Sequence, residues 1–234
     1  MNSKYKILKY KSQNTSELED LISIEEPLEI SIEFKENNTF HKKTISITMR
    51  TPGNDSDLVR GFLFNERIIE DIKYIEKIES IGEKTGQYKL QNKILVTLNN
   101  SENVDIDKIK RNFLTNSSCG VCGKTSLDSL DIIKNDKVIK SLPKIAHELI
   151  MQSPSLLRKN QSEFFKTGGI HASGLFSNDG NLIAIREDVG RHNALDKLIG
   201  HSLNKKILNP KSQFIACSGR LNFELVQKVL MANI

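Results

Sequence analysis

From Glu29 to Met49, apolar and polar residues alternate with the period of a β-strand. Two such runs, Glu29–Phe34 and Thr44–Met49, lie on either side of the polar segment 35–38. Runs of period two that flank a short polar turn are typical of a hairpin. We therefore predict an antiparallel hairpin here, preceded by an irregular segment over residues 1–20.

A break in this pattern at Thr51–Asp55 precedes apolar residues at helical spacing. It predicts a helix from Ser56 to about Asn65, capped by Asp55. Two further strands and a charged helix are expected near Ile75–Ile81, Ile94–Leu98 and Asp105–Leu114. Residues 1–114 are therefore interpreted as an N-terminal portion of α+β type.

Small residues and glycine dominate residues 115–125, which predicts a flexible loop. Helices are expected after it over Ser126–Lys134 and Pro143–Lys159, the second interrupted by Pro154. Residues 126–234 are interpreted as a C-terminal α/β portion. Its strands and helices are expected at 168–176, 182–185, 192–199, 214–217 and 222–232.

The last two units of the chain repeat one pattern. Each is an apolar strand, a short loop ending in Gly-Arg, an Asn two residues after the Arg, and an amphipathic helix. The two segments are Gly190-Arg191-His192-Asn193 and Gly219-Arg220-Leu221-Asn222. Successive strand-to-helix units favour a parallel sheet whose loops gather at the carboxyl ends of the strands, where ligands bind.

These two Gly-Arg loops are candidate phosphate sites. Each offers helix N-terminal N–H groups, a glycine that admits an oxygen closely, and a guanidinium for bidentate contact. In the alternative interpretation, the glycine serves a tight turn and the arginine caps a neighbouring carbonyl. The repetition favours binding of a dinucleotide, through Gly190, Arg191, His192, Asn193, Ser218, Gly219 and Arg220.

The segment Cys119-Gly120-Val121-Cys122-Gly123 carries the sharpest chemical signal. At the junction of a loop and a helix, free backbone N–H groups and Lys124 favour the thiolate, which is the form that attacks sulfur. One alternative is half of a zinc site, completed by Cys217 with His171 or His192. Another is a thioredoxin-type dithiol, although the residues before Cys119 do not form the strand that it requires.

The other candidate residues carry weaker signals. Glu187 and Asp188, beside Arg191 and His192, form a polar cluster that suits general acid–base chemistry or, equally, a salt-bridged surface loop. His171 is expected at a hydrogen-bonded core position, and Cys217 is expected to be a small buried residue.

Composition narrows the class of partner. The formal net charge is +5 and the isoelectric point about 9.0, which suits an anionic ligand. The lysines are dispersed and aromatic residues make up only 6%, so no nucleic-acid partner is expected. No apolar run has the length of a signal peptide or a membrane span, so we expect a cytoplasmic protein without membrane contact.

Several stretches resemble a known family, the formate dehydrogenase accessory sulfurtransferases (FdhD). The most specific is the fifteen-residue stretch from Arg186 to Gly200. The others, in family order, are Glu26–Ile30, Met49–Gly53, Gly61–Phe64, Ser118–Gly123, Thr167–Ala172 and Ser218–Arg220.

The resemblance implies a sulfurtransferase that carries sulfur as a cysteine persulfide. Cys119 would accept sulfane sulfur from a cysteine desulfurase, and Cys122 would assist or relay it. The sulfur would pass to the molybdenum (or tungsten) bis-pterin guanine dinucleotide cofactor required for formate dehydrogenase activity. This cofactor is bound as a substrate, so no permanent cofactor and no resident metal are expected. The alternative is a non-catalytic chaperone that binds the cofactor during formate dehydrogenase maturation.

The resemblance also implies a cytidine-deaminase-like α/β sandwich and a homodimer. The segment His171-Ala172-Ser173 lacks the glutamate of the deaminase H-x-E signature, which disfavours hydrolytic deamination. Family members continue beyond the helix that ends here at Ile234. We therefore expect a C-terminal portion that is truncated at its end, with an exposed sheet edge.

Overall fold

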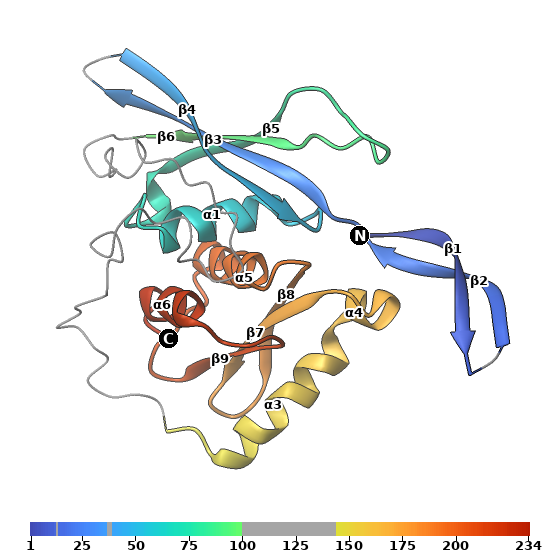
Figure 1. Ribbon diagram of the computed structural model, residues 1–234. Coiled ribbons are helices and arrows are strands. Elements are labelled where there is room, and N and C mark those ends of the chain that lie inside the picture. The colour runs from blue at the N-terminus through green and yellow to red at the C-terminus, as the bar shows by residue number, and fades with distance from the viewer. Residues whose placement is uncertain (13, 37–38, 100–143) are drawn as a thin grey trace.

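The computed structural model describes residues 1–12, 14–36, 39–99 and 144–234 (Figure 1). The predicted helices over 105–114 and Ser126–Lys134 and the predicted loop over 115–125, with Cys119 and Cys122, lie outside the described residues. None of the helices in the described ranges is long and apolar enough to span a bilayer.

The N-terminal portion is built on a four-stranded sheet with the order β4-β3-β6-β5. The predicted hairpin is confirmed: β3 pairs antiparallel with β4, and alternate residues of β3 are buried. β6 then lies parallel to β3, and β5 closes the other edge. The strands span Glu26–Glu36 (β3), Thr39–Arg50 (β4), Ile75–Ile81 (β5) and Lys93–Leu98 (β6), with a short 3-10 helix, η1, at Ile72–Tyr74.

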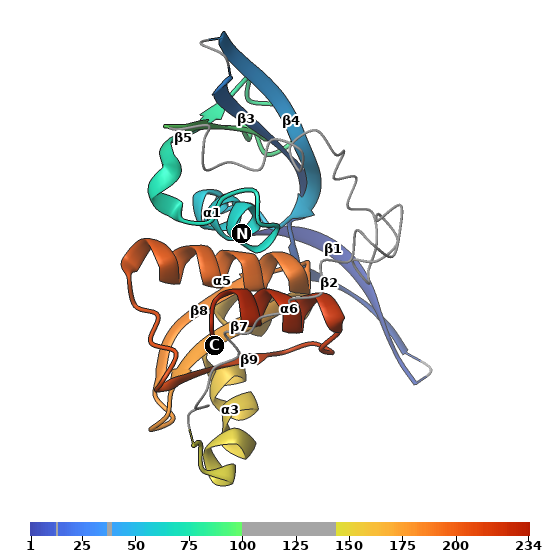
Figure 2. The same ribbon diagram turned by 90° about the vertical axis from the view of Figure 1, so that its left-hand side faces the viewer.

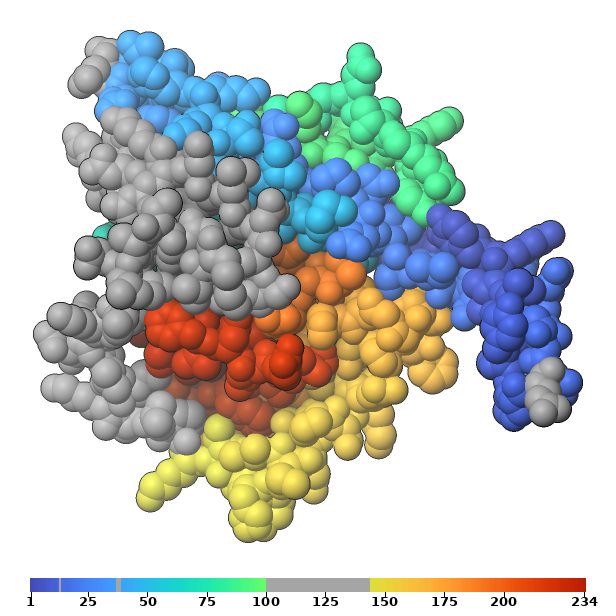
Figure 3. All heavy atoms as spheres, viewed as in Figure 1, coloured from blue at the N-terminus to red at the C-terminus, as the bar shows by residue number. Residues whose placement is uncertain are grey.

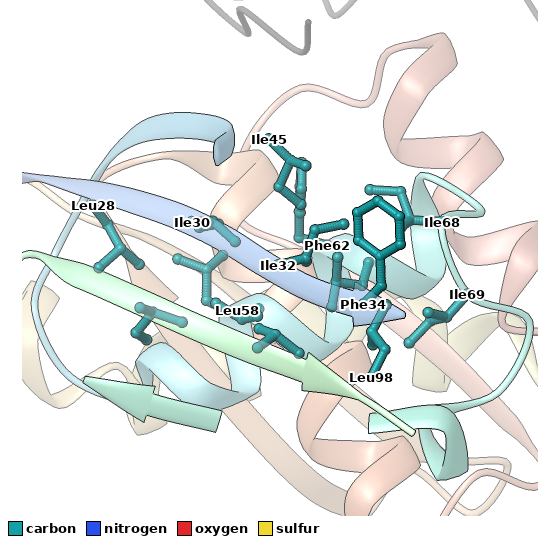
Figure 4. Close-up of a cluster of buried hydrophobic side chains, with 14 residues drawn as sticks. Leu28, Ile30, Ile32, Phe34, Ile45, Leu58, Phe62, Ile68, Ile69 and Leu98 are labelled. Carbon is teal, nitrogen blue, oxygen red and sulfur yellow. The ribbon is translucent and has the colours of Figure 1, made fainter. Parts of the chain in front are cut away.

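Helix α1 (Asp55–Asn65) covers one face of this sheet. Its N-cap is Asn54 in a left-handed conformation, so the prediction of Asp55 as the cap is wrong by one residue. Leu58, Phe62 and Leu63 on α1 pack against apolar strand residues in one buried cluster (Figure 4). Because the strands alternate and the helix carries a matching apolar stripe, burial of these side chains stabilises this half of the molecule.

The C-terminal portion holds a three-stranded sheet with the order β8-β7-β9. The strands span His171–Ser177 (β7), Leu182–Asp188 (β8) and Gln213–Cys217 (β9). The predicted parallel sheet is wrong, because β7 pairs antiparallel with both of its neighbours. Since β8 and β9 both run opposite to β7, they still point in the same direction. Their carboxyl ends therefore meet at one edge of the sheet, as the sequence predicted for their loops.

Helices lie on both faces of this sheet (Figure 2). α5 (Arg191–Lys205) and α6 (Phe223–Met231) cover one face, and Leu195, Ile199 and Leu225 pack there with Ile215 of β9. On the other face, Leu157 of α3 (His147–Asn160) packs against β7. The short helix α4 (Ser162–Thr167) connects α3 to β7. The segment Arg186–Asp188, expected in a loop, completes β8 instead.

Helix α3 continues through Pro154, so the predicted interruption is wrong. A proline lacks the N–H that would bond to the carbonyl four residues earlier, which is that of Ile150. The Ser153 hydroxyl donates to this same carbonyl at 2.8 Å. The helix therefore keeps the Ile150 oxygen hydrogen-bonded despite the proline.

Glycines allow α1 and α5 to cross closely and so join the two portions. A Cβ on Gly61 would lie 1.9 Å from the Asp196 carbonyl oxygen, and one on Gly200 would lie 2.0 Å from the Asp57 carbonyl oxygen. No side chain fits at these distances. The two layers of strands are therefore separated by two helices in direct backbone contact.

The first residues form a two-stranded ribbon, not the irregular segment predicted for residues 1–20. β1 (Asn2–Lys11) pairs antiparallel with β2 (Asn14–Ser23), and the ribbon projects from the rest of the molecule (Figures 1 and 3). Its base is tied to α4: the Asn2 amide donates to Glu163 at 2.8 Å. Burial alone would raise the pKa of Glu163, but this bond, the Met1 ammonium and Lys166 lower it to about 2.

Candidate functional site

The two Gly-Arg loops lie side by side at the edge of the sheet where β8 and β9 end and β7 begins. His171 at the start of β7 is paired with Asp188, and Ser173 is paired with Cys217. A Cβ on Gly219 would lie 3.1 Å from Nδ1 of His171 and 3.6 Å from Cδ of Arg191. The structure thus brings together two segments that are almost thirty residues apart in the sequence.

Asp188 organises the first loop. This carboxylate is fully buried and accepts hydrogen bonds from the backbone N–H of Gly190 at 2.9 Å and of Thr51 at 3.2 Å. Nζ of Lys197 lies 2.6 Å from Asp188, and its side chain is 1% exposed. Lys197 also donates to the Thr51 carbonyl at 2.7 Å. This buried ion pair therefore fixes Gly190 at the N-cap of α5 and ties the loop to the N-terminal portion.

The carboxylate of Glu187 is also hydrogen-bonded within the fold. It accepts hydrogen bonds from the backbone N–H of Glu163 at 3.0 Å and of Phe164 at 2.9 Å, at the start of α4. With Asp188 paired to Lys197, both carboxylates have structural partners. The structure favours the interpretation of this cluster as an internal salt-bridged and capping network over general acid–base chemistry.

Asn193 holds the first turn of α5 against β4. Its amide nitrogen donates to the Met49 carbonyl at 2.7 Å and to the Thr48 hydroxyl at 3.2 Å. The matching Asn222 of the second unit serves differently, because its side chain caps α6 by accepting the Leu225 N–H at 3.0 Å. The two units therefore differ in backbone as well as in the use of the asparagine: Gly190 is the N-cap of α5, whereas Gly219 lies three residues before Asn222, the N-cap of α6.

His192 links the two units. Its Nε2 atom lies 3.1 Å from the Asn222 amide nitrogen and 3.2 Å from a carboxylate oxygen of Glu224. Burial first, and then the charge of Lys228, lower the pKa of His192, while Asp196 opposes this. The imidazole thus lies in the contact between α5 and α6 and holds the loops together.

The second loop is the more open of the two. Ser218 accepts a hydrogen bond from the Ala172 N–H at 2.9 Å, which anchors the loop to β7. The side chain of Arg220 is exposed, whereas that of Arg191 is half-buried. Burial first, and then the charge of Arg191, lower the pKa of the neighbouring His171. Its ring is therefore neutral at pH 7 and adds no positive charge beside the arginines.

A cavity of about 480 Å³ opens beside these loops. Helices α3 and α4 form one wall, and His171, Val189, Cys217 and Ser218 form the other. Burial raises the pKa of the Cys217 thiol, which agrees with its prediction as a small, partly buried residue of low reactivity. The cavity adjoins the second Gly-Arg loop, because Ser218 of that loop lines it.

Two buried polar residues were not predicted from the sequence. One is Lys228 of α6, whose Nζ lies 3.0 Å from Asp196 and 3.1 Å from Glu66. Burial alone would lower the pKa of Lys228, but these carboxylates and Glu224 raise it above its usual value. The other is Gln161 in the cavity wall, 3% exposed. Neither has a pattern in the sequence that separates it from a solvent-exposed residue.

The zinc interpretation combines the CxxC segment with Cys217 and either His171 or His192. Across the described ranges, no group of three or more His, Cys, Asp and Glu side chains is placed to hold a metal ion. The interpretation also requires Cys119 and Cys122, which lie outside those ranges.

Comparison with known proteins places these features in a family. The model of the FdhD/NarQ family matches residues 24–234. The chain belongs to the FdhD/NarQ family. The match includes both Gly-Arg loops, the cavity and the CxxC segment.

Curated FdhD proteins match almost the whole chain. The "Sulfur carrier protein FdhD" of Sulfolobus acidocaldarius is 39% identical over 231 residues, which are 99% of this chain and 81% of the relative. The protein of the same name from Picrophilus torridus is 42% identical over 212 residues, covering 91% of this chain and 75% of the relative.

A solved structure shares the fold. It is a candidate formate dehydrogenase accessory protein from Desulfotalea psychrophila, with a TM-score of 0.64 and 21% identity. The match covers 100% of this chain and 80% of the other. The mixed α/β architecture is therefore shared with this accessory protein, while the cytidine-deaminase-like sandwich stays a prediction.

Proposed function

We propose that this protein is a sulfur carrier in the maturation of formate dehydrogenase. The observation that carries the proposal is the match, over nearly the full chain, to relatives named sulfur carrier protein FdhD. The neighbour described as a formate dehydrogenase accessory protein suggests the enzyme that is served. We further propose a cytoplasmic homodimer.

The first step is transfer of sulfur from a cysteine desulfurase to Cys119. The Cys119 thiolate attacks the terminal sulfur of the desulfurase persulfide, a new S–S bond forms, and the desulfurase cysteine leaves as a thiolate. Gly120 and Gly123 keep side chains away from both sulfurs, which permits close approach of a second protein. Lys124 and the backbone N–H groups of the helix that the sequence predicts after it would favour the Cys119 thiolate.

The second step delivers the sulfur to the cofactor. Attack of the Cys122 thiolate on the inner sulfur of the Cys119 persulfide releases the terminal sulfur as sulfide. The two electrons that this sulfur gains come from the formation of the Cys119–Cys122 disulfide, which a cellular thiol then reduces. Cys122 thus assists the transfer by releasing the sulfide. The released sulfide would become a new ligand of the molybdenum or tungsten.

The Gly-Arg loops would hold the bis-pterin guanine dinucleotide cargo by its phosphates. Arg220 and Ser218 are exposed at this edge, and Arg191 lies beside Gly219. A guanidinium and backbone N–H groups bind phosphate oxygens through charge-assisted hydrogen bonds. His192 and Asn193 would act indirectly, because their side chains hold the loops in place.

Rescue of formate dehydrogenase in a strain that lacks its own accessory protein tests this proposal. The wild-type chain restores activity, and Cys119→Ala returns it to background at equal protein level by immunoblot. Arg220→Ala lowers activity while leaving Cys119 free to carry sulfur. Full rescue by Cys119→Ala would contradict the sulfur-transfer mechanism and identify a non-catalytic cofactor-binding chaperone instead.

A further inference from the structure

One ring nitrogen between the two Gly-Arg loops has two neighbours with opposite requirements. Nε2 of His192 lies 3.1 Å from the amide nitrogen of Asn222 and 3.2 Å from a carboxylate oxygen of Glu224. The amide nitrogen can only donate a proton, and the carboxylate can only accept one. Because a ring nitrogen carries either a lone pair or a proton, Nε2 can bond to one of these neighbours but not to both.

The amide of Asn222 has its orientation fixed by the helix that it caps. Its oxygen accepts the backbone N–H of Leu225 at 3.0 Å, which the NH₂ group of an amide cannot do. The NH₂ group therefore faces the imidazole of His192 and needs a lone pair on Nε2. We assign the proton of the neutral ring to Nδ1 on this basis.

The charged groups near the ring decide when it takes up a second proton. Within the ranges that the structure describes, they are Arg191 and Asp196 of α5, Glu224 and Lys228 of α6, and Glu66 at the end of α1. Burial first, and then the charge of Lys228, lower the pKa of His192 from 6.5, whereas Asp196 raises it. The ring is therefore neutral at pH 7 and becomes protonated in more acidic solution.

Glu224 is the group that a protonated ring would pair with. Nζ of Lys228 lies 3.0 Å from Asp196 and 3.1 Å from Glu66, but 4.0 Å from Glu224. Of these three carboxylates, Glu224 is the farthest from the lysine, and it is the one in contact with the imidazole of His192. A proton on Nε2 converts this contact into an ion pair.

The same proton disrupts the cap of α6. With Nε2 protonated, the ring N–H and the NH₂ group of Asn222 are two donors that face each other at 3.1 Å. Exchange of the amide oxygen and nitrogen would place the NH₂ group against the N–H of Leu225, which is also a donor. The Asn222 side chain must therefore turn away, and Leu225 loses its acceptor.

We propose that His192 is a proton-dependent positioning residue for the second Gly-Arg loop: the neutral ring holds Asn222 at the start of α6, and the protonated ring pairs with Glu224 and releases Asn222. Asn222 directly follows Gly219-Arg220-Leu221, so its release loosens the loop that carries Arg220. This role rests on the proposed function, because the loop is there assigned to the phosphates of the cargo.

Nitrogen NMR of the full chain, labelled with ¹⁵N in histidine, locates the proton. The signals of His192 are assigned by their absence in His192→Gln. At about pH 8 we expect a proton on Nδ1 and none on Nε2, and on acidification a proton on both. Glu224→Gln should lower the pH at which this second proton binds, because the ion pair is lost. A proton on Nε2 at about pH 8 would overturn the inference.

Hydrogen exchange of the Leu225 amide reports on the cap. The exchange rate is compared with that of an unstructured peptide at the same pH, which removes the intrinsic effect of pH. In the wild-type chain, protection should fall about tenfold when His192 is protonated. In His192→Gln, whose side-chain oxygen can accept from Asn222 but does not titrate, protection should not change with pH. The same fall in His192→Gln would overturn the inference.

His147→Gln is the matched control for this measurement. The side chain of His147 is 88% exposed and lies on α3, so the variant should lose protection at Leu225 as the wild-type chain does. Thermal unfolding at each pH confirms that all variants are folded. A constant protection at Leu225 in both the wild-type chain and this control would also overturn the inference.

Binding of pyrophosphate at about pH 8 tests the effect on the loop. Calorimetric titration should give His192→Gln an affinity within about twofold of wild type, and His192→Phe an affinity about tenfold weaker. Equal affinity of His192→Phe and wild type would contradict the positioning role. Failure of the wild-type chain to bind pyrophosphate contradicts the phosphate site of the proposed function alone, because the nitrogen spectra and the exchange of Leu225 need no ligand.

Discussion

At the scale of single residues, the site depends on buried charges that the sequence shows only as surface-type residues. Asp188 and Lys197 are at most 1% exposed, yet both occur in a polar-looking stretch. The sequence repeat correctly predicted that the two Gly-Arg loops lie close together, with Gly219 beside Arg191. The sequence could not distinguish Asn193 and His192, whose side chains form hydrogen bonds within the fold, from residues that face a ligand. Periodicity shows on which face of a helix a residue lies, but not its hydrogen-bond partner.

Replacement of Lys197 with methionine should strongly destabilise the protein. The change leaves the Asp188 carboxylate buried without its counter-charge, which costs about 3–5 kcal/mol. Urea unfolding measures this free energy. Lys205→Met, at an exposed lysine of the same helix, is the control and should change stability by less than about 0.5 kcal/mol. A loss below about 1 kcal/mol in Lys197→Met would show that Asp188 is protonated or otherwise satisfied.

At the scale of elements, the strands and helices with strong periodicity could be predicted from the sequence. The neighbours of each strand in its sheet could not. The hairpin β3–β4, α1 and α5 follow directly from the sequence pattern. The antiparallel order β8-β7-β9 does not, because a period of two shows which face a residue occupies and not which strand lies beside it. The ribbon β1–β2 was missed because its residues are mostly exposed on both faces.

The crossing of α1 and α5 should not tolerate a single added methyl group. In Gly200→Ala, the new Cβ would lie 2.0 Å from the Asp57 carbonyl oxygen, so the helices must separate. We expect a loss of about 1–3 kcal/mol or more in the free energy of unfolding. Gly169→Ala is the matched control, because its Cβ would meet only the Thr167 carbonyl oxygen, at 3.9 Å. Equal stability of the two variants would show that the helices pack less closely than described.

At the scale of the whole molecule, two sheets lie on opposite sides of the α1–α5 pair (Figures 1 and 2). The edge that carries both Gly-Arg loops belongs to the C-terminal sheet but is anchored to the N-terminal portion through Thr51 and Asn193. The CxxC segment lies in the sequence between the two portions. In the function that we propose, the CxxC segment carries sulfur and the edge with the two Gly-Arg loops holds the acceptor.

Sulfur transfer is tested most directly by the intact mass of the protein after incubation with a cysteine desulfurase and cysteine. A sulfur carrier should gain about 32 Da, one sulfur atom, that a thiol reductant removes. Peptide mapping should place it on the peptide that contains Cys119, and Cys119→Ala should abolish it while Cys122→Ala retains it. An equal gain in Cys119→Ala, or a gain only on the peptide with Cys217, would show that Cys119 is not the residue that carries sulfur.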